Sequence, residues 1–224
     1  MSTRLFFADV RPFLAPERLD AALPLLDDMR REKISRLKAD ADKARSVGAG
    51  LLLRSALAAC GLPDDTPKLV FGDCGKPELA RFPGIHFNLS HSGDYALCAV
   101  SDTPVGCDIE APRPVDLHLA ERFFAPSERQ ALAAAPEAEQ HALFLKIWTQ
   151  KESYQKAAGR GLSLPPASFS VVGADGTPRL SPAPELPFRL FSYAALPGYV
   201  LSLCAVCREK PPLERLTLSP EAAY

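Results

Sequence analysis

The sequence lacks several features that would place it in a membrane, secreted or nucleic-acid-binding class. No apolar run reaches the roughly eighteen residues needed to span a bilayer. The first residues do not show the charged-then-apolar pattern of a secretory signal. The 26 basic and 27 acidic residues give a formal net charge of -1, so no global field favours nucleic acid or an anionic membrane surface. We therefore expect a cytoplasmic protein without nucleic-acid or membrane partners, in which any anion site is local.

The cysteines also lack the arrangement of a zinc site or a disulfide framework. Cys204 and Cys207 are separated by two residues, but no second Cys pair or His pair stands at zinc spacing. Both lie in the apolar segment Tyr199–Cys207, which is typical of a buried strand. We expect reduced thiols that pack in the core, for the six residues Cys60, Cys74, Cys98, Cys107, Cys204 and Cys207.

The pattern of apolar and turn-forming residues predicts a mixed α+β protein. With 224 residues and 47% hydrophobic content, the chain can form one large domain or two small ones. We expect a charged stretch over 30–43 and a loose tail from Lys210 on. The helices are predicted at 16–26, 42–60, from 126 and from 136 to 158, and the strands at 5–8, 68–71, 85–89, 94–101, 105–110, 165–172, 188–193 and 198–206.

Two apolar segments resemble each other across the chain. Tyr95–Val100 and Tyr199–Val206 each follow a glycine turn, and each comes some forty to fifty residues after a long predicted helix. Two similar α+β halves, 1–104 and 105–224, would explain this similarity. Coincidence between two apolar strands explains it almost as well.

Acidic residues gather at the centre of the chain. Side chains alternate along an extended segment, so Asp108 and Glu110 share one face while Cys107 and Ile109 share the other. Carboxylate pairs of this kind are ligands that Mg²⁺ prefers, although such a pair also occurs on a solvated outer face. Glu152 adds a third acid on a helical stretch.

The helix around Glu152 combines acid and base on one stripe. Trp148, Glu152 and Lys156 are four residues apart in succession and therefore line up along the helix. A neighbouring stripe holds Phe144, Ile147, Lys151 and Tyr154. Acid and base side by side predict phosphate chemistry, and the alternative is a helical surface pair without a catalytic role.

Four short motifs occur in a fixed order along the chain. They are Gly75–Pro77, Phe87–Ser92, Gly106–Glu110 and Trp148–Lys156. In this order and spacing the sequence resembles the 4′-phosphopantetheinyl transferases of the Sfp type. With Arg45 and the segment Gly161–Pro165, the resemblance covers roughly residues 30 to 172. Ala125 departs from the Ser or Thr that relatives often carry before the following helix, a difference that concerns capping.

The resemblance implies a pseudo-dimer of two α+β halves, each with a small, mainly antiparallel sheet and a long helix. Coenzyme A would bind in the cleft between them, with its nucleotide on the side of 1–104 and the magnesium and catalytic acids on 105–224. The resemblance assigns Mg²⁺ to Asp108, Glu110 and Glu152, catalysis to Asp108, Glu152 and Lys156, and coenzyme A contacts to Arg45, Gly75, Lys76, Pro77, Asn88, Ser90, His91, Asp108, Lys151, Glu152 and Lys156.

Within this assignment, Arg45 and His91 would bind the 3′-phosphate of coenzyme A, because a remote phosphate needs its own cationic pocket. Lys76 would line the adenine side. Lys33 and Arg36 are looser candidates from the basic stretch, in which basic side chains outnumber acidic ones.

The resemblance implies an enzyme that moves the 4′-phosphopantetheine arm of coenzyme A to a serine hydroxyl of an apo acyl or peptidyl carrier protein. Mg²⁺ would be required and adenosine 3′,5′-bisphosphate released, by a chain acting as a monomer. Two alternatives stay open at this point. One is a non-catalytic module that binds coenzyme A or a carrier protein, and the other is a magnesium-dependent hydrolase of the coenzyme A pyrophosphate.

Overall fold

A computed structural model describes residues 2–72, 75–173 and 176–220. The helices are α1 (Pro16–Ala22), α2 (Asp28–Arg36), α3 (Asp40–Ala59), α4 (Leu119–Phe123), α5 (Pro126–Ala134) and α6 (Glu137–Ala158). Short 3₁₀ turns cover Arg11–Leu14, Leu23–Leu25, Gly161–Ser163 and Pro166–Ser168. The strands are β1 (Arg4–Asp9), β2 (Leu69–Phe71), β3 (Pro77–Leu79), β4 (His86–Ser92), β5 (Tyr95–Ser101), β6 (Val105–Glu110), β7 (Ser170–Val172), β8 (Pro178–Ser181), β9 (Arg189–Tyr193), β10 (Val200–Ala205) and β11 (Leu213–Arg215).

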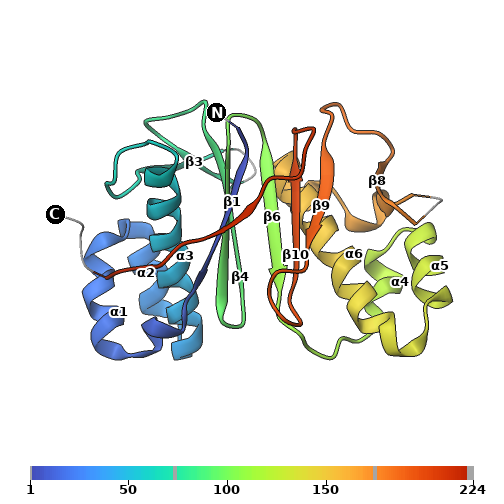
Figure 1. Ribbon diagram of the computed structural model, residues 1–224, viewed down its shortest axis with the longest axis horizontal. Helices are drawn as coiled ribbons and strands as arrows, with labels where there is room; N and C mark the ends of the chain where they lie inside the picture. Colours follow the sequence, from blue (N-terminus) through green and yellow to red (C-terminus); the bar gives the residue numbers. More distant parts are fainter. Residues whose placement is uncertain (1, 73–74, 174–175, 221–224) are drawn as a thin grey trace.

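Two small sheets stand face to face between two long helices (Figure 1). The first sheet has the strand order β11-β1-β5-β4, and the second has the order β6-β10-β9. Helix α3 packs on the outer face of the first sheet, and α6 packs on the outer face of the second. All neighbours within these sheets are antiparallel except β1 and β11. The expected α+β architecture of two sheet-and-helix halves is confirmed.

The similarity between the two apolar segments corresponds to equivalent places in the two sheets. β5 and β10 are inner strands, and each is buried along most of its length. Their tyrosines meet where the halves join, because the rings of Tyr95 and Tyr199 lie 5.0 Å apart in an edge-to-face contact. The fold therefore repeats one sheet-and-helix unit.

The hydrophobic core has three parts that follow this layering. One cluster lies between α3 and the first sheet, a second lies between α6 and the second sheet, and a third fills the space between the sheets. The third cluster contains Leu97 from β5, Ile109 from β6 and Leu203 from β10, each at most 1% exposed. Burying apolar side chains on both faces of each sheet holds the halves together as one body.

The tail prediction was wrong, because the segment after Lys210 is structured. Strand β11 runs parallel to β1, with Leu5 opposite Leu213, and Leu218 is buried in the core of the first half. The end of the chain thus returns to the first sheet. The predicted charged stretch over 30–43 overlaps most of α2, whose first turn is capped by Asp27 accepting a hydrogen bond from the amide of Arg30.

The described cysteines are free thiols, and Cys98, Cys107 and Cys204 are buried in the core, as expected. Asp73 and Cys74 of the expected turn lie outside the described residues. In the described ranges, no helix is both long enough and apolar enough to cross a membrane.

Candidate active site

Strand β6 presents its acids to the second half's long helix. Cys107 and Ile109 belong to the cluster between the sheets, whereas Asp108 bonds to Lys156 of α6. This is the alternation expected from an extended chain. One face of β6 therefore packs in the core, and the opposite face carries the acids of the site.

Gly106 lets α6 approach β6 closely. A Cβ built on this glycine would lie 2.1 Å from the carbonyl oxygen of Ser153 and 2.4 Å from the amide nitrogen of Ala157, both of them backbone atoms. No side chain fits in that space. The absence of a side chain at 106 thus brings Glu152 and Lys156 within reach of Asp108, two residues further along the same face.

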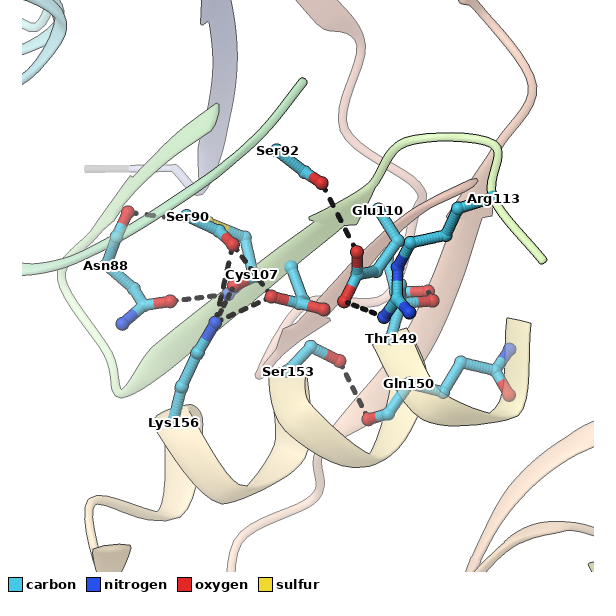
Figure 2. A network of polar contacts seen from close by, with 12 residues as sticks. Asn88, Ser90, Ser92, Cys107, Glu110, Arg113, Thr149, Gln150, Ser153 and Lys156 are labelled. Carbon is cyan, nitrogen blue, oxygen red and sulfur yellow. Dashed lines mark hydrogen bonds and ion pairs between the residues drawn. The ribbon is translucent and has the colours of Figure 1, made fainter. Parts of the chain in front are cut away.

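Lys156 and Asp108 form the central ion pair of the site. Lys156 Nζ lies 2.7 Å from Asp108 Oδ1, and Ser90 Oγ donates to the same oxygen over 2.7 Å. Asp108 is only 5% exposed. Burial lowers the pKa of Lys156, but the attraction and hydrogen bond of Asp108 outweigh it, so the net pKa is raised and Lys156 stays charged. Figure 2 shows Lys156 rising from α6 toward Ser90 and Asn88.

Glu110 is held by a second serine of β4. Ser92 Oγ donates to Glu110 Oε2 over 3.2 Å and accepts a hydrogen bond from the amide of Ala111 over 3.0 Å (Figure 2). Arg113 also contacts Glu110, at 3.4 Å. Ser90 and Ser92 share one face of β4, and Asp108 and Glu110 share one face of β6. Each serine therefore bonds to one acid, Ser90 to Asp108 and Ser92 to Glu110. This contact joins the two halves.

Glu152 completes a group of three acids. It is half-buried, and burial raises its pKa, with the negative charges of Asp108 and Glu110 adding to the rise. Lys156 opposes this shift only in part. The negative charges of Asp108 and Glu110 act on Glu152, so a cation among the three carboxylates would be favourable.

These acids fit a divalent cation by their donor chemistry and charge. Carboxylate oxygens are hard ligands suited to Mg²⁺, and a bound cation would relieve the repulsion at Glu152. In the described part of the chain, no three His, Cys, Asp or Glu side chains stand in a formed metal-binding arrangement. The fit therefore rests on the donor set and not on coordination geometry.

A pocket of about 490 Å³ opens beside the ion pair. It brings together Glu152, Lys156 and Asn88 with the expected Gly75–Pro77 turn. Asn88 also ties the strands, because its Oδ1 accepts a hydrogen bond from the amide of Cys107 over 2.9 Å. Trp148, Glu152 and Lys156 all line this pocket, which confirms the predicted stripe.

The apolar wall of this pocket was not predicted. Phe123, at the end of α4, packs edge-to-face on Trp148 with ring centroids 5.5 Å apart. Both residues line the pocket. The Phe123-Phe124 pair before a helix start was visible in the sequence, but nothing local indicated its direction.

Lys76 lies in the same pocket but is bonded to the backbone. Its Nζ donates to the carbonyl oxygens of Lys156, over 2.7 Å, and of Val105, over 3.2 Å. Burial lowers the pKa of this ammonium. The predicted adenine-side residue thus binds the end of α6.

A cationic cluster surrounds His91 at the end of β4. Partial desolvation lowers the pKa of His91, and the positive charges of Lys33, Arg45 and Arg30 lower it further. Arg45 also pairs with Asp42 and lies 3.4 Å from the carbonyl oxygen of Gly93. The positive charges that act on His91 produce a local field that favours an anion.

Arg30 was missed as a member of this cluster. Its Nη1 donates to the carbonyl oxygen of Ser46 over 3.2 Å, while its buried Nε has no hydrogen-bond partner. The signal in the sequence was spacing, since Arg30 and Lys33 are three residues apart and share a face of α2. Arg36, the other loose candidate, pairs with Glu32, with 74% of its side chain exposed.

The prediction that Lys151 approaches phosphate was wrong. Its side chain is 1% exposed, and its Nζ lies 2.6 Å from Glu128 Oε2 and 2.7 Å from the carbonyl oxygen of Phe169. Glu128 also accepts hydrogen bonds from the amides of Ala125 and Val171. Burial lowers the pKa of Lys151, and Glu128 counteracts this. The pair therefore ties α5, α6 and β7 together, and Glu128 satisfies the amide of the N-cap residue Ala125, whose own side chain makes no capping bond.

We expect Lys151→Met to lower the free energy of unfolding by about 3–5 kcal/mol, because it leaves the charge of Glu128 buried and unpaired. Denaturant titration measures this loss. The folded variant should keep the KM of the wild type for its phosphate-bearing substrate. Lys146→Met, an exposed lysine of the same helix, is the matched control. If Lys151→Met had the stability of the wild type but a raised KM, Lys151 would be a substrate-binding residue after all.

The fold and site define a two-half α+β protein with acids, a lysine and a cationic cluster gathered where the halves meet. Comparison with known proteins identifies the family to which the chain belongs. Residues 14–103 match the N-terminal family of 4′-phosphopantetheinyl transferases, and residues 104–204 match the 4′-phosphopantetheinyl transferase superfamily. The break between the matches falls just before β6.

Curated relatives agree over most of the chain. A 4′-phosphopantetheinyl transferase of Bacillus subtilis is 38% identical over 200 residues, which cover 87% of this chain and 88% of the relative. The 4′-phosphopantetheinyl transferase Sfp of Bacillus subtilis strain 168 is 34% identical over 201 residues, covering 88% and 90%. The 4′-phosphopantetheinyl transferase psf-1 of Bacillus pumilus is 35% identical over 200 residues, covering 88% and 84%. The chain belongs to the 4′-phosphopantetheinyl transferase superfamily and is of the Sfp type.

Proposed function

We propose that the protein transfers the 4′-phosphopantetheine arm of coenzyme A to a serine hydroxyl of an apo carrier protein, with Mg²⁺, and releases adenosine 3′,5′-bisphosphate. The observation that carries this proposal is the Asp108–Lys156 ion pair at the edge of a pocket lined by Glu152 and Lys156. The cationic groups around His91 lie at the strand β4 that also carries Ser90, a partner of Asp108. We propose a cytoplasmic monomer, since one chain supplies both sides of the site and the described cysteines are free thiols.

The reaction is a substitution at the β-phosphorus of coenzyme A. The serine oxygen forms a bond to that phosphorus, and the bond to the oxygen bridging the α- and β-phosphates breaks. The serine loses its proton, and the leaving bisphosphate takes the electron pair of the broken bond. Bound at Asp108, Glu110 and Glu152, Mg²⁺ would supply neutralisation of the pyrophosphate charge.

The chain's own groups fit the proton and charge requirements of this step. A raised pKa makes Glu152 a better proton acceptor than an ordinary glutamate. We assign it the serine proton, taken directly or through water. Lys156 is charged and fixed by Asp108, so it can stabilise the phosphate oxygens without reorganisation.

The cationic cluster of Arg30, Lys33, Arg45 and His91 fits the 3′-phosphate of the donor. We expect the wild type to prefer coenzyme A over its 3′-dephospho form, and Arg45→Ala to shrink this preference by about tenfold to a hundredfold. The reason is the loss of a charge-assisted hydrogen bond, which contributes on the order of 1.5–3 kcal/mol. The kcat/KM ratio for the two donors measures it. A mutant that discriminates as strongly as wild type would refute the assignment.

Binding of the bisphosphate should depend on pH through His91. The pKa of His91 is below the ordinary 6.5 in the free protein, and a phosphate would raise it by favouring the imidazolium. Affinity should therefore increase as the pH falls through the pKa of the bound state and weaken as the pH rises. Calorimetry with adenosine 3′,5′-bisphosphate measures this. The ligand phosphate titrates near pH 6 itself, so the comparison is with His91→Gln. Parallel pH profiles for the two proteins would exclude His91.

Intact-protein mass spectrometry of a panel of apo acyl and peptidyl carrier proteins tests the proposed function. Coenzyme A and Mg²⁺ should add a phosphopantetheine mass to at least one carrier. Unmodified carriers with cleaved coenzyme A would instead identify a hydrolase. Binding of coenzyme A without modification or cleavage would identify a non-catalytic module.

A further inference from the structure

Lys76 reaches from the first half into the second. It stands directly before β3 in the hairpin formed by β2 and β3, yet its ammonium bonds to the carbonyl oxygens of Val105 in β6 and Lys156 in α6. Both acceptors are backbone groups of the elements that carry Asp108, Glu152 and Lys156. The contact therefore links the hairpin to the reaction centre through main-chain atoms.

The carbonyl of Lys156 belongs to the last turn of α6, where carbonyl groups have no partner within the helix. The helix ends before Gly159, which has a left-handed φ of 66°. The amide of Gly159 donates a hydrogen bond to the carbonyl oxygen of Gln155. Lys76 supplies the donor for the next carbonyl. A cation at this end also complements the helix dipole.

Lys76 covers the helix end as well as bonding to it. Its Cδ lies 3.6 Å from the position that a Cβ on Gly159 would occupy. The side chain is half-buried, and desolvation lowers its pKa. Desolvation at this place favours short bonds to the carbonyl dipoles, of which the one to Lys156 measures 2.7 Å.

Lys156 is therefore held from two directions. Its backbone oxygen accepts from Lys76, while its ammonium contacts Asp108 Oδ1 at 2.7 Å and Ser90 Oγ at 3.4 Å. Fraying of the last turn would move the ammonium relative to Asp108. Small displacements of a catalytic group are sufficient to slow an enzyme, by about a hundredfold for 1 Å.

We propose that Lys76 is a positioning residue that caps the C-terminal end of α6 and thereby fixes Lys156 against Asp108, an inference that rests on the proposed transferase function. In this role the ammonium of Lys76 is not a ligand of the nucleotide. Its bonds to two backbone carbonyls of the second half distinguish it from Lys33, the exposed lysine of the cationic cluster.

The test compares Lys76→Met, which keeps the length but removes the donor, with Lys76→Arg and the exposed control Lys146→Met. We expect Lys76→Met to lower kcat by about tenfold to a hundredfold with little change in the KM for coenzyme A. Amide hydrogen exchange at residues 157–160 should accelerate by about tenfold or more, reflecting a lost charge-assisted bond. Lys76→Arg should recover part of kcat, and the control should match wild type.

An effect on KM instead of kcat would overturn the proposal. A raised KM and weaker binding of coenzyme A, with kcat and exchange unchanged, would make Lys76 a nucleotide ligand, and wild-type values throughout would remove any role. If Lys76→Met does not fold, Lys76→Arg decides by the same split between kcat and KM. If the wild type itself transfers nothing, the transferase proposal fails, whereas hydrogen exchange still reports whether Lys76 caps α6.

Discussion

Asp108→Asn is expected to reduce turnover by about 10²- to 10³-fold while the protein stays folded. Asp108 is 5% exposed and accepts hydrogen bonds from Lys156 and Ser90 on one oxygen. The asparagine keeps the shape but removes the charge that holds Lys156 and that would bind the cation. Losing one preorganised electrostatic contact of this kind costs about 2.7–4 kcal/mol in the transition state.

Steady-state transfer to an apo carrier protein, followed over a range of Mg²⁺ concentrations, measures this loss. Asp20→Asn replaces an exposed acid of α1 and is the matched control. Glu110→Ala should reduce turnover less, because water or a substrate oxygen can take its place at the cation. Full activity of Asp108→Asn in the presence of a chelator would contradict both the metal assignment and the role of the ion pair.

Glu152→Gln should lower turnover by about 10²- to 10⁴-fold, the usual contribution of a general base. The amide has the shape of the acid, so folding and weak binding of coenzyme A should persist. Single-turnover transfer measures the chemical step directly. Glu139→Gln, an exposed acid in the first turn of the same helix, serves as control. Near-normal transfer by Glu152→Gln would show that another group accepts the proton of the serine.

The pH profile gives this prediction a second readout. Burial and the charges of Asp108 and Glu110 raise the pKa of Glu152 above the ordinary value of 4.5. A base must be deprotonated to act, so kcat should rise with pH as Glu152 ionises and then level off, and a bound cation would shift this rise toward lower pH. The rising limb should be absent from the residual activity of Glu152→Gln. An unchanged limb in that variant would show that another group titrates.

Local spacing was sufficient to predict the part of the site that lies on single elements. Alternation along β6 placed Asp108 and Glu110 on one face, and the four-residue repeat placed Trp148, Glu152 and Lys156 along one pocket. These relations depend only on the geometry of a strand or a helix. They therefore hold before any tertiary contact is known.

The errors concern residues whose partners are distant in sequence. Lys151 precedes Glu152 by one position and so turns about 100° away around the helix, where Glu128 meets it from α5. The pairing of β11 with β1 joins opposite ends of the chain, and no pattern near Leu213 indicates it. Arg30 enters the cationic cluster only because α2 packs on α3.

Binding of Mn²⁺ in place of Mg²⁺ tests the central claim, that the acids between the halves hold a divalent cation together with coenzyme A. Electron paramagnetic resonance measures free Mn²⁺ in titrations of the wild type, Asp108→Asn and the control Asp20→Asn, with and without coenzyme A. After subtraction of the Mn²⁺ that coenzyme A binds without protein, we predict one bound ion per chain for the wild type and the control in the presence of coenzyme A. Asp108→Asn should lose most of this binding. Equal binding by all three proteins would contradict the account.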